Sequence, residues 1–176
     1  MLVILRADAE PHFEQVRELI LELAAWDLAQ ASRLHLDPKL VAEFFYSVPD
    51  ELPGAYAPPG GSLFLATHSG KAAGCVAFRS MSSDVCELKR MYVRPGFRGM
   101  GIGRRLIDTL IQAARQSGYS LMRLETTTAA EGAVSLYRTV GFRPCQPYYA
   151  IPDTFREVTI FMEVNLTEGA SNPGCL

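Results

Sequence analysis

The feature that most limits the fold of this chain is a glycine-rich segment, RPGFRGMGIGRR (residues 94–105), between two regular elements. The residues before it, 85–93 (VCELKRMYV), have the composition of a β-strand. The residues after it, 102–117, place apolar side chains at helical spacing and end at Gly118, which can cap a helix. Another strand candidate follows at 120–125. A strand, a helix and a strand in this order predict a crossover unit whose two strands are parallel.

The rest of the chain supplies further strands and helices around this unit. His68-Ser69-Gly70 predicts a hairpin turn, so the strands on either side of it are antiparallel. Four of the eleven prolines fall in 49–61, which predicts a loop. The remaining predicted elements are strands at 2–6, 62–67, 71–80, 143–150 and 156–165, a helix capped by Asp8 and extending to Trp26, and helices at 38–47 and 130–140. We therefore expect an α/β fold, with a mixed sheet and helices on both faces.

Length and composition exclude several classes of protein. A chain of 176 residues is most simply one domain, and we expect 1–166 to form it and 167–176 to be a flexible tail. The 17 basic and 19 acidic residues argue against a strongly basic nucleic-acid-binding protein. There is no apolar run long enough to span a membrane and no secretory signal, so we expect a cytoplasmic protein. The cysteines lack metal-binding spacing, which predicts core thiols and no metal.

The three glycines Gly99, Gly101 and Gly103 stand at the start of the predicted helix. Glycine allows a close approach of ligand to backbone, and the free N–H groups of a helix start favour a phosphate. The spacing does not match the dinucleotide-binding pattern, because Leu106 stands where a glycine or alanine is needed, and no Gly-Lys-Ser/Thr follows as in a P-loop. The segment therefore predicts a pyrophosphate site of another kind, or else a glycine-rich turn with surface arginines.

The spacing Arg98-x-x-Gly101-x-Gly103 resembles the coenzyme A pyrophosphate loop of the GCN5-related N-acetyltransferase (GNAT) family. Met91-Tyr92-Val93 stands where that family has the end of a strand, and AVSLYRTVGF (133–142) resembles its later helix and Gly-Phe pair. The resemblance implies a single-domain GNAT-like fold. Its mostly antiparallel sheet would have six or seven strands and a splayed parallel central pair. It also implies acetyl-CoA as cosubstrate, and no metal.

The same resemblance implies a set of cofactor-binding residues. They are Met91, Tyr92, Val93, Arg98, Gly99, Met100, Gly101, Ile102, Gly103 and Arg104. One departure stands out, because many members carry an asparagine near the end of the next strand, where this chain has Leu124-Glu125-Thr126-Thr127-Thr128. Six basic residues lie within seventeen positions around the loop, which predicts a local cationic site: Lys89, Arg90, Arg94, Arg98, Arg104 and Arg105.

Two residues are candidates for the proton transfers that amide formation needs. Glu87 occupies the position of the catalytic glutamate in histone-type members and would act as base, directly or through a water. Period-two alternation, barring a bulge, places it on one face with Lys89, Met91 and Val93. Tyr137 occupies the position of the tyrosine that protonates the departing thiolate. The alternatives are a glutamate paired with a neighbouring base and a tyrosine that only packs.

The acceptor pocket is the least determined part of the site. First-helix and late-loop residues form it in the family, which here implies Trp26, Tyr56, Tyr148, Tyr149 and Phe155. We expect an N-acetyltransferase that acts on a primary amine of a small molecule, amino acid or peptide in a ternary complex. It would be a monomer or homodimer without nucleic-acid or membrane partners. The alternatives are a non-catalytic module that binds acyl-CoA in the same cleft and, less strongly, a nucleotide-binding protein.

Overall fold

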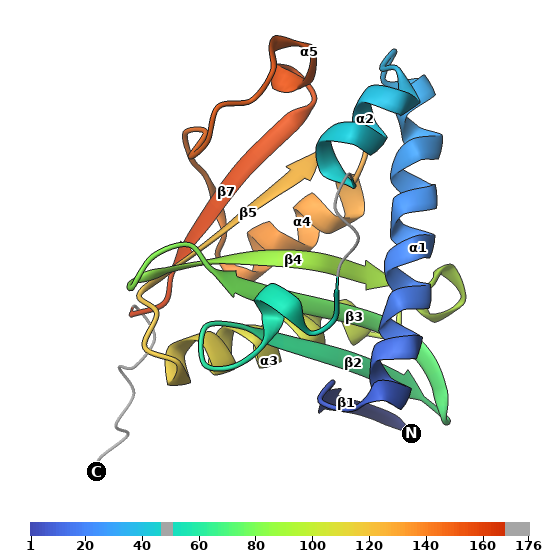
Figure 1. The fold of residues 1–176 in the computed structure, drawn as a ribbon, viewed down its shortest axis with the longest axis vertical. Coiled ribbons are helices and arrows are strands. Elements are labelled where there is room, and N and C mark those ends of the chain that lie inside the picture. Colours follow the sequence, from blue (N-terminus) through green and yellow to red (C-terminus); the bar gives the residue numbers. More distant parts are fainter. Residues whose placement is uncertain (47–50, 168–176) are drawn as a thin grey trace.

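The computed structural model describes residues 1–46 and 51–167 (Figure 1). In these ranges, the strands are β1 (Leu2–Arg6), β2 (Ser62–His68), β3 (Lys71–Ser80), β4 (Val85–Val93), β5 (Leu121–Thr127), β6 (Arg143–Pro144) and β7 (Thr159–Asn165). The α-helices are α1 (Glu10–Arg33), α2 (Pro38–Phe45), α3 (Ile102–Gln116), α4 (Glu131–Val140) and α5 (Asp153–Arg156). Residue 47 of the expected second helix, residues 49–50 of the expected loop and residues 168–176 of the expected tail lie outside the described residues.

The seven strands form one sheet in the order β1-β2-β3-β4-β5-β7-β6. Every neighbouring pair is antiparallel except β4 and β5, which are parallel and joined through α3. A parallel pair needs a crossover connection, and the amphipathic helix after the glycine loop provides it. The predicted α/β fold, with its mixed sheet and parallel central pair, is confirmed.

Helices cover both faces of the sheet, as predicted (Figure 1). On one face α3 buries its apolar stripe, including Leu106, Ile107 and Leu110, against the central strands, and α4 packs beside it. On the other face α1 buries Val16 and Leu19 against β2 and β3. The two apolar layers hold the central strands between them, so the end of β4 is fixed from both sides.

Several predicted boundaries are wrong. The first helix continues past Trp26 to Arg33, and the last strand begins at Thr159 and not at residue 156. The residue that precedes the first turn of α1 is Ala9, so Asp8 lies one position too early to cap the helix. The strand expected at 143–150 is reduced to Arg143–Pro144. Pro144 and Pro147 interrupt this segment, and proline cannot donate to a β-ladder. The chain beyond β6 therefore leaves the sheet as a loop.

A β-bulge in β4 changes which side chains share a face. Between the pairs Ala77–Lys89 and Cys75–Tyr92, β3 has one residue and β4 has two, Arg90 and Met91. Arg90 has a φ of +57°, in the left-handed region, as residues at bulges often do. The alternation predicted for Glu87, Lys89, Met91 and Val93 is therefore wrong. Met91 and Val93 pack on the α3 face, whereas Lys89 lies opposite Ala77, which packs on the α1 face.

The two parallel strands separate beyond Glu87. Their ladder consists of three pairs, from Val85–Leu121 to Glu87–Arg123, and the rest of β5 pairs only with β7. Figure 1 shows β5 and β7 turning away from β4 at this point. The second half of β4 thus presents its edge to open space on the side where β5 has left, and this opening positions the site.

Candidate active site

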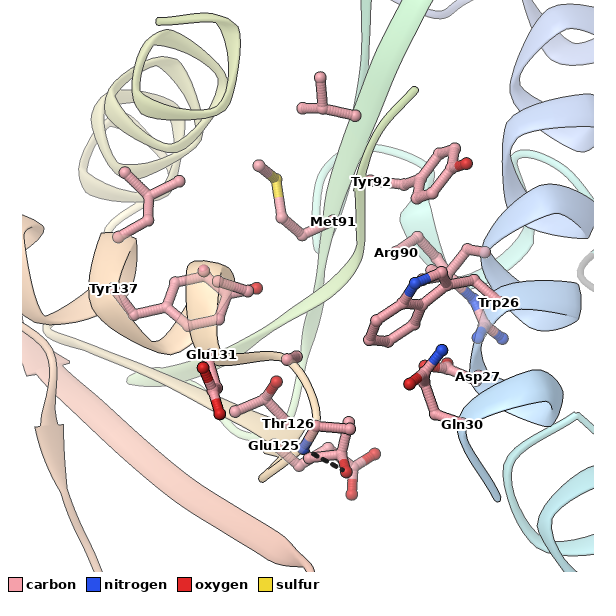
Figure 2. Close-up of a pocket in the computed structure, with 18 of the residues that line it drawn as sticks. Trp26, Asp27, Gln30, Arg90, Met91, Tyr92, Glu125, Thr126, Glu131 and Tyr137 are labelled. Atoms are coloured by element: carbon pink, nitrogen blue, oxygen red, sulfur yellow. Dashed lines mark hydrogen bonds between the residues drawn. The ribbon is translucent and has the colours of Figure 1, made fainter. Parts of the chain in front are cut away.

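A cavity of about 780 Å³ occupies the opening between the separated strands. Its walls come from α1 and α2, the second half of β4, the glycine loop with the start of α3, the end of β5, and α4. Ten of the predicted site residues line it: Met91, Tyr92, Val93, Arg98, Gly99, Gly101, Ile102, Gly103, Arg104 and Tyr137. Met100, which is 54% exposed, and Glu87 do not. Figure 2 shows Tyr137 on one wall and Trp26, Asp27 and Gln30 of α1 on the opposite wall.

At one end of the cavity the glycine loop presents backbone donors. Gly99 and Gly101 have φ values of +78° and +74°, which glycine adopts without strain. A Cβ at either position would have no atom within 4 Å, so these two glycines serve the backbone conformation and leave open space beside it. The first N–H donation in α3 runs from Arg105 to the carbonyl of Gly101, so the three preceding amides have no partner inside the helix. This end of the cavity suits an anion such as a pyrophosphate.

Gly103 has a different role from the other two glycines, because it is surrounded by side chains. A Cβ at this position would lie 2.9 Å from Cδ2 of Leu136 and 3.2 Å from Cε of Met91. The absence of a side chain here lets α4 and β4 approach the first turn of α3. Gly103 therefore determines how wide the cavity is between Leu136 and Met91, next to the glycine loop.

The predicted cluster of six basic residues does not converge on the loop. Arg94 lies against α1, where its Nη2 is 2.8 Å from Oε1 of Glu22, and its pKa is raised by hydrogen bonding to that carboxylate. Arg104 pairs with Asp108 on its own helix at 2.9 Å. Arg98 donates from Nε to the carbonyl of Val93 at 3.0 Å, which ties the loop to the end of β4. Of the arginines in the loop segment, Arg98 and Arg104 line the cavity, and Asp108 offsets part of the charge of Arg104.

Tyr137 is 4% exposed, and it lines the middle of the cavity. Its ring packs edge-on against Phe142, with ring centroids 5.7 Å apart. Figure 2 shows its hydroxyl pointing from α4 into the cavity. Burial raises the pKa of Tyr137 far above its ordinary value of 10.0, and the negative charge of Asp27 raises it further. The phenol is therefore protonated at neutral pH, and it can donate a proton as well as pack.

Glu87 is 2% exposed and fully engaged by its neighbours. Its Oε2 accepts a hydrogen bond from Nε of Arg79 at 2.8 Å, and its Oε1 accepts one from the hydroxyl of Tyr148 at 3.0 Å. The ammonium group of Lys89 lies 3.8 Å from Oε1. The carboxylate thus does not line the cavity, and a role as base would have to pass through other groups.

A partly buried ion pair links β4 and β5 where these two strands have separated. Nζ of Lys89 on β4 lies 2.7 Å from Oε1 of Glu125 on β5, and the hydroxyl of Tyr149 donates to Oε2 of Glu125. Both Lys89 and Glu125 line the cavity. The sequence analysis assigned no role to Glu125. A lysine in the middle of the predicted strand 85–93 and a glutamate at the end of the predicted strand 120–125, parallel to it, were the signal that could have found this pair.

The end of the cavity away from the glycine loop is largely aromatic. Trp26 and Phe155 line it as expected, together with Phe45 and Tyr46. Tyr56 does not, because it is buried against the α1 face of the sheet. Tyr148 and Tyr149 do not line the cavity either, and their hydroxyls donate to Glu87 and Glu125 respectively.

One acidic group lies in this aromatic wall. Asp27 on α1 lines the cavity, and the hydroxyl of Tyr46 donates to its Oδ2. Burial raises the pKa of Asp27 above its ordinary value of 3.8, while the hydrogen bond from Tyr46 and the charge of Arg90 oppose that rise. The guanidinium of Arg90 lies 5.5 Å from the centre of the Tyr46 ring.

Two further findings concern only residues 1–46 and 51–167. No cluster of three or more His, Cys, Asp or Glu side chains that could hold a metal ion is found there. None of the helices in these ranges is both long enough and apolar enough to cross a membrane. Cys75 and Cys86 are thiols buried in the core, as predicted, and the thiol of Cys145 is partly buried.

Comparison with known proteins places this geometry in a family. The profile of the Acetyltransferase (GNAT) family matches residues 21–142. An uncharacterized N-acetyltransferase of Schizosaccharomyces pombe is 41% identical over 113 residues, which are 61% of this chain and 69% of that protein. The crystal structure of a putative acyl-CoA N-acyltransferase from Klebsiella pneumoniae has a TM-score of 0.70 and 26% identity, and the alignment covers 94% of this chain and 98% of that one.

A more distant structure comes from Elizabethkingia anophelis. It is a GNAT family acetyltransferase with acetyl-CoA bound, and it shares the fold at a TM-score of 0.55 and 19% identity, covering 93% of this chain and 97% of that one. The family match spans the strand separation, the glycine loop and Tyr137, which together form the cavity. The chain belongs to the Acetyltransferase (GNAT) family, and it is an acetyl-CoA-dependent acyltransferase.

Proposed function

We propose that this protein is an N-acetyltransferase that transfers an acetyl group from acetyl-CoA to a primary amine of a small molecule, amino acid or peptide. The observation that carries the proposal is the continuity of one cavity. It runs from the anion-binding glycine loop, past the protonated phenol of Tyr137, to an aromatic wall that holds a carboxylate. Both substrates can therefore reach one point at the same time, which favours direct attack in a ternary complex.

The residues at the loop end fit the pyrophosphate of coenzyme A. The open space beside Gly99 and Gly101 admits a ligand against the backbone, and the free amides at the start of α3 supply its hydrogen bonds. Arg98 and Arg104 add positive charge there. The edge of β4 at Met91 and Val93, which β5 no longer covers, would hold the pantetheine arm. When bound, acetyl-CoA supplies the thioester whose carbonyl carbon is attacked.

Acetyl transfer to an amine has three requirements: the amine must be deprotonated, the charge on the carbonyl oxygen must be stabilised, and the departing sulfur must be protonated. The acceptor is an ammonium ion at neutral pH, because its pKa resembles that of lysine, about 10.4, and it must lose a proton. Backbone N–H groups along the uncovered half of β4 can stabilise the charge that develops on the carbonyl oxygen. The amine nitrogen then forms its bond to carbon while the carbon–sulfur bond breaks. Tyr137 gives its proton to the departing sulfur, and the nitrogen releases a second proton that restores the phenol.

Saturating acetyl-CoA is expected to raise the melting temperature of the protein by about 5–10 °C. A ligand present at about 100 times its Kd stabilises the folded state by about 2.7 kcal/mol. For a domain of this size, each kcal/mol corresponds to about 2–4 °C. Differential scanning fluorimetry measures the shift, with ATP and NAD at the same concentration as controls. An unchanged melting temperature with acetyl-CoA, or an equal shift with ATP, would contradict the proposal.

A further inference from the structure

The cavity contains an acidic group that the sequence did not bring to notice. Asp27 stands on the wall opposite Tyr137, at the end of the cavity away from the glycine loop (Figure 2). In the proposed function the pyrophosphate of coenzyme A occupies the end of the cavity at the glycine loop. An acceptor must therefore enter through the part of the cavity bounded by α1 and α2. We propose that Asp27 binds the ammonium group of the acceptor and takes its proton before the amine attacks the thioester. This role rests on the proposed function.

The hydrogen bonds of Asp27 involve only one of its two carboxylate oxygens, so the other can accept a proton. The hydroxyl of Tyr46 donates to Oδ2, and within the described residues no group donates to Oδ1. The side chain lies among aromatic and aliphatic groups, where an ammonium ion gains both from the carboxylate and from the faces of aromatic rings. A partly buried carboxylate with one oxygen free is the kind of group that serves as a general base.

The other carboxylates near the cavity are less suited to this role. Glu131 lines the cavity, but it is exposed to solvent in the first turn of α4, on the wall that carries Tyr137 (Figure 2). Glu125 lines the cavity, but one oxygen pairs with Lys89 at 2.7 Å and the other accepts from Tyr149. Glu87 is held by Arg79 and Tyr148, and its side chain does not line the cavity. Among the described carboxylates that line the cavity, Asp27 is the one that is partly buried and has an oxygen without a hydrogen bond from another described residue.

The groups around Asp27 determine how its protonation depends on pH. Burial raises the pKa of Asp27, the hydrogen bond from Tyr46 and the charge of Arg90 on β4 lower it, and the charge of Glu125 on β5 raises it. Across the cavity Tyr137 stays protonated, so it adds no charge below pH 10. Asp27 must be ionised to accept a proton. Activity is therefore lost as the pH falls through the raised pKa of Asp27, which gives the profile of kcat/KM an acid limb.

The step balances without any further reactant. The ammonium ion gives one proton to the carboxylate of Asp27 and becomes a neutral amine, which forms the carbon–nitrogen bond. The carbon–sulfur bond breaks, Tyr137 protonates the sulfur, which leaves as a thiol, and the nitrogen gives its second proton back to the Tyr137 phenolate. Asp27 then releases its proton to solvent, so the sum is one amide, one thiol and one proton.

The test is the pH profile of kcat/KM for the wild type and four variants, with an amine that the wild type acetylates. Asp27→Asn is expected to lower kcat/KM by about 100-fold or more at pH 7 and to remove the acid limb. Its defect should shrink as the pH rises toward the pKa of the amine, because unprotonated acceptor then becomes available. Tyr46→Phe removes a hydrogen bond that lowers the pKa of Asp27, so its acid limb should move to higher pH. Glu125→Gln should keep the acid limb, whatever its effect on rate.

Acetyl-CoA binding and an exposed control variant distinguish failure of the Asp27 role from failure of the proposed function. Glu14→Gln changes an exposed carboxylate on the same helix and should match the wild type throughout. Asp27→Asn should bind acetyl-CoA within threefold of the wild type, which shows that it folds. If it behaves like Glu14→Gln in rate and pH profile, or if Glu125→Gln removes the acid limb instead, the role of Asp27 is overturned while the proposed function stands. If the wild type itself acetylates no amine, both are overturned.

Discussion

Replacing Tyr137 with phenylalanine is expected to lower kcat by about 10²- to 10⁴-fold at pH 7, the range typical for loss of a general acid. The hydroxyl points into the cavity, and burial together with the charge of Asp27 keeps it protonated. The substitution keeps the ring and its contact with Phe142, so folding and acetyl-CoA binding should remain close to those of the wild type. Because the pKa of Tyr137 is raised well above 10.0, the wild-type kcat should show no alkaline limb from this group below pH 10.

Tyr119→Phe provides the matched control for this variant. The hydroxyl of Tyr119 donates to the carbonyl of Gly60 at 2.8 Å, and the residue does not line the cavity. Removal of this hydroxyl in Tyr119→Phe should leave kcat within twofold of the wild-type value. Steady-state assays of thiol release, together with melting temperatures, measure both variants. A Tyr137→Phe variant with the kcat of the wild type would reduce Tyr137 to a packing residue.

Gly103→Val is expected to weaken acetyl-CoA binding by about 10- to 100-fold. The new Cβ would lie 2.9 Å from Cδ2 of Leu136 and 3.2 Å from Cε of Met91. Both contacts are with the far ends of flexible side chains, so the clash is relieved by moving them, and both line the cavity. Overpacking of this kind costs about 1–3 kcal/mol, and about 1.4 kcal/mol corresponds to tenfold in affinity. The free-energy cost of the added side chain should therefore appear mainly as weaker acetyl-CoA binding and less as a loss of folding stability.

Gly96→Val tests whether any added bulk near the loop has the same effect. A Cβ at Gly96 has no atom within 4 Å, its φ is not in the left-handed region, and the residue does not line the cavity. Its Kd for acetyl-CoA should stay within twofold of the wild type. Titration calorimetry with both variants measures the difference. Equal Kd values for Gly103→Val and the wild type would show that the approach of α4 to α3 does not control the site.

The sequence predicted the parts of the fold that depend on local pattern. The apolar stripe of α3, the hairpin at His68-Ser69-Gly70 and the crossover through the glycine loop each follow from spacing along the chain, and each is present. The faces of β4 could not be predicted in this way. One extra residue at Arg90 reverses every side chain after it, and a bulge is set by the strand paired opposite.

The same distinction applies to the site. The glycines and Tyr137 were found because their positions along the chain resemble a family pattern. The partners of Glu87, and the pairing of Lys89 with Glu125, depend on strands and loops that are distant in sequence. Asp27 was missed because nothing in its neighbourhood on α1 marks it as different from a solvent-exposed acid. Only the packing of α1 and α2 over the separated strands makes it part of the cavity.

The most direct test of acetyl transfer is a reaction of the wild-type protein with acetyl-CoA and a panel of primary amines. The panel contains amino acids, arylalkylamines, polyamines and short peptides with free N-termini. Thiol release and mass spectrometry of the acceptor are measured together. We expect at least one amine to gain a single acetyl group, with one thiol released for each amide formed. Tight binding of acetyl-CoA without acetylation of any amine would contradict transfer to a primary amine and would favour a module that only binds acyl-CoA.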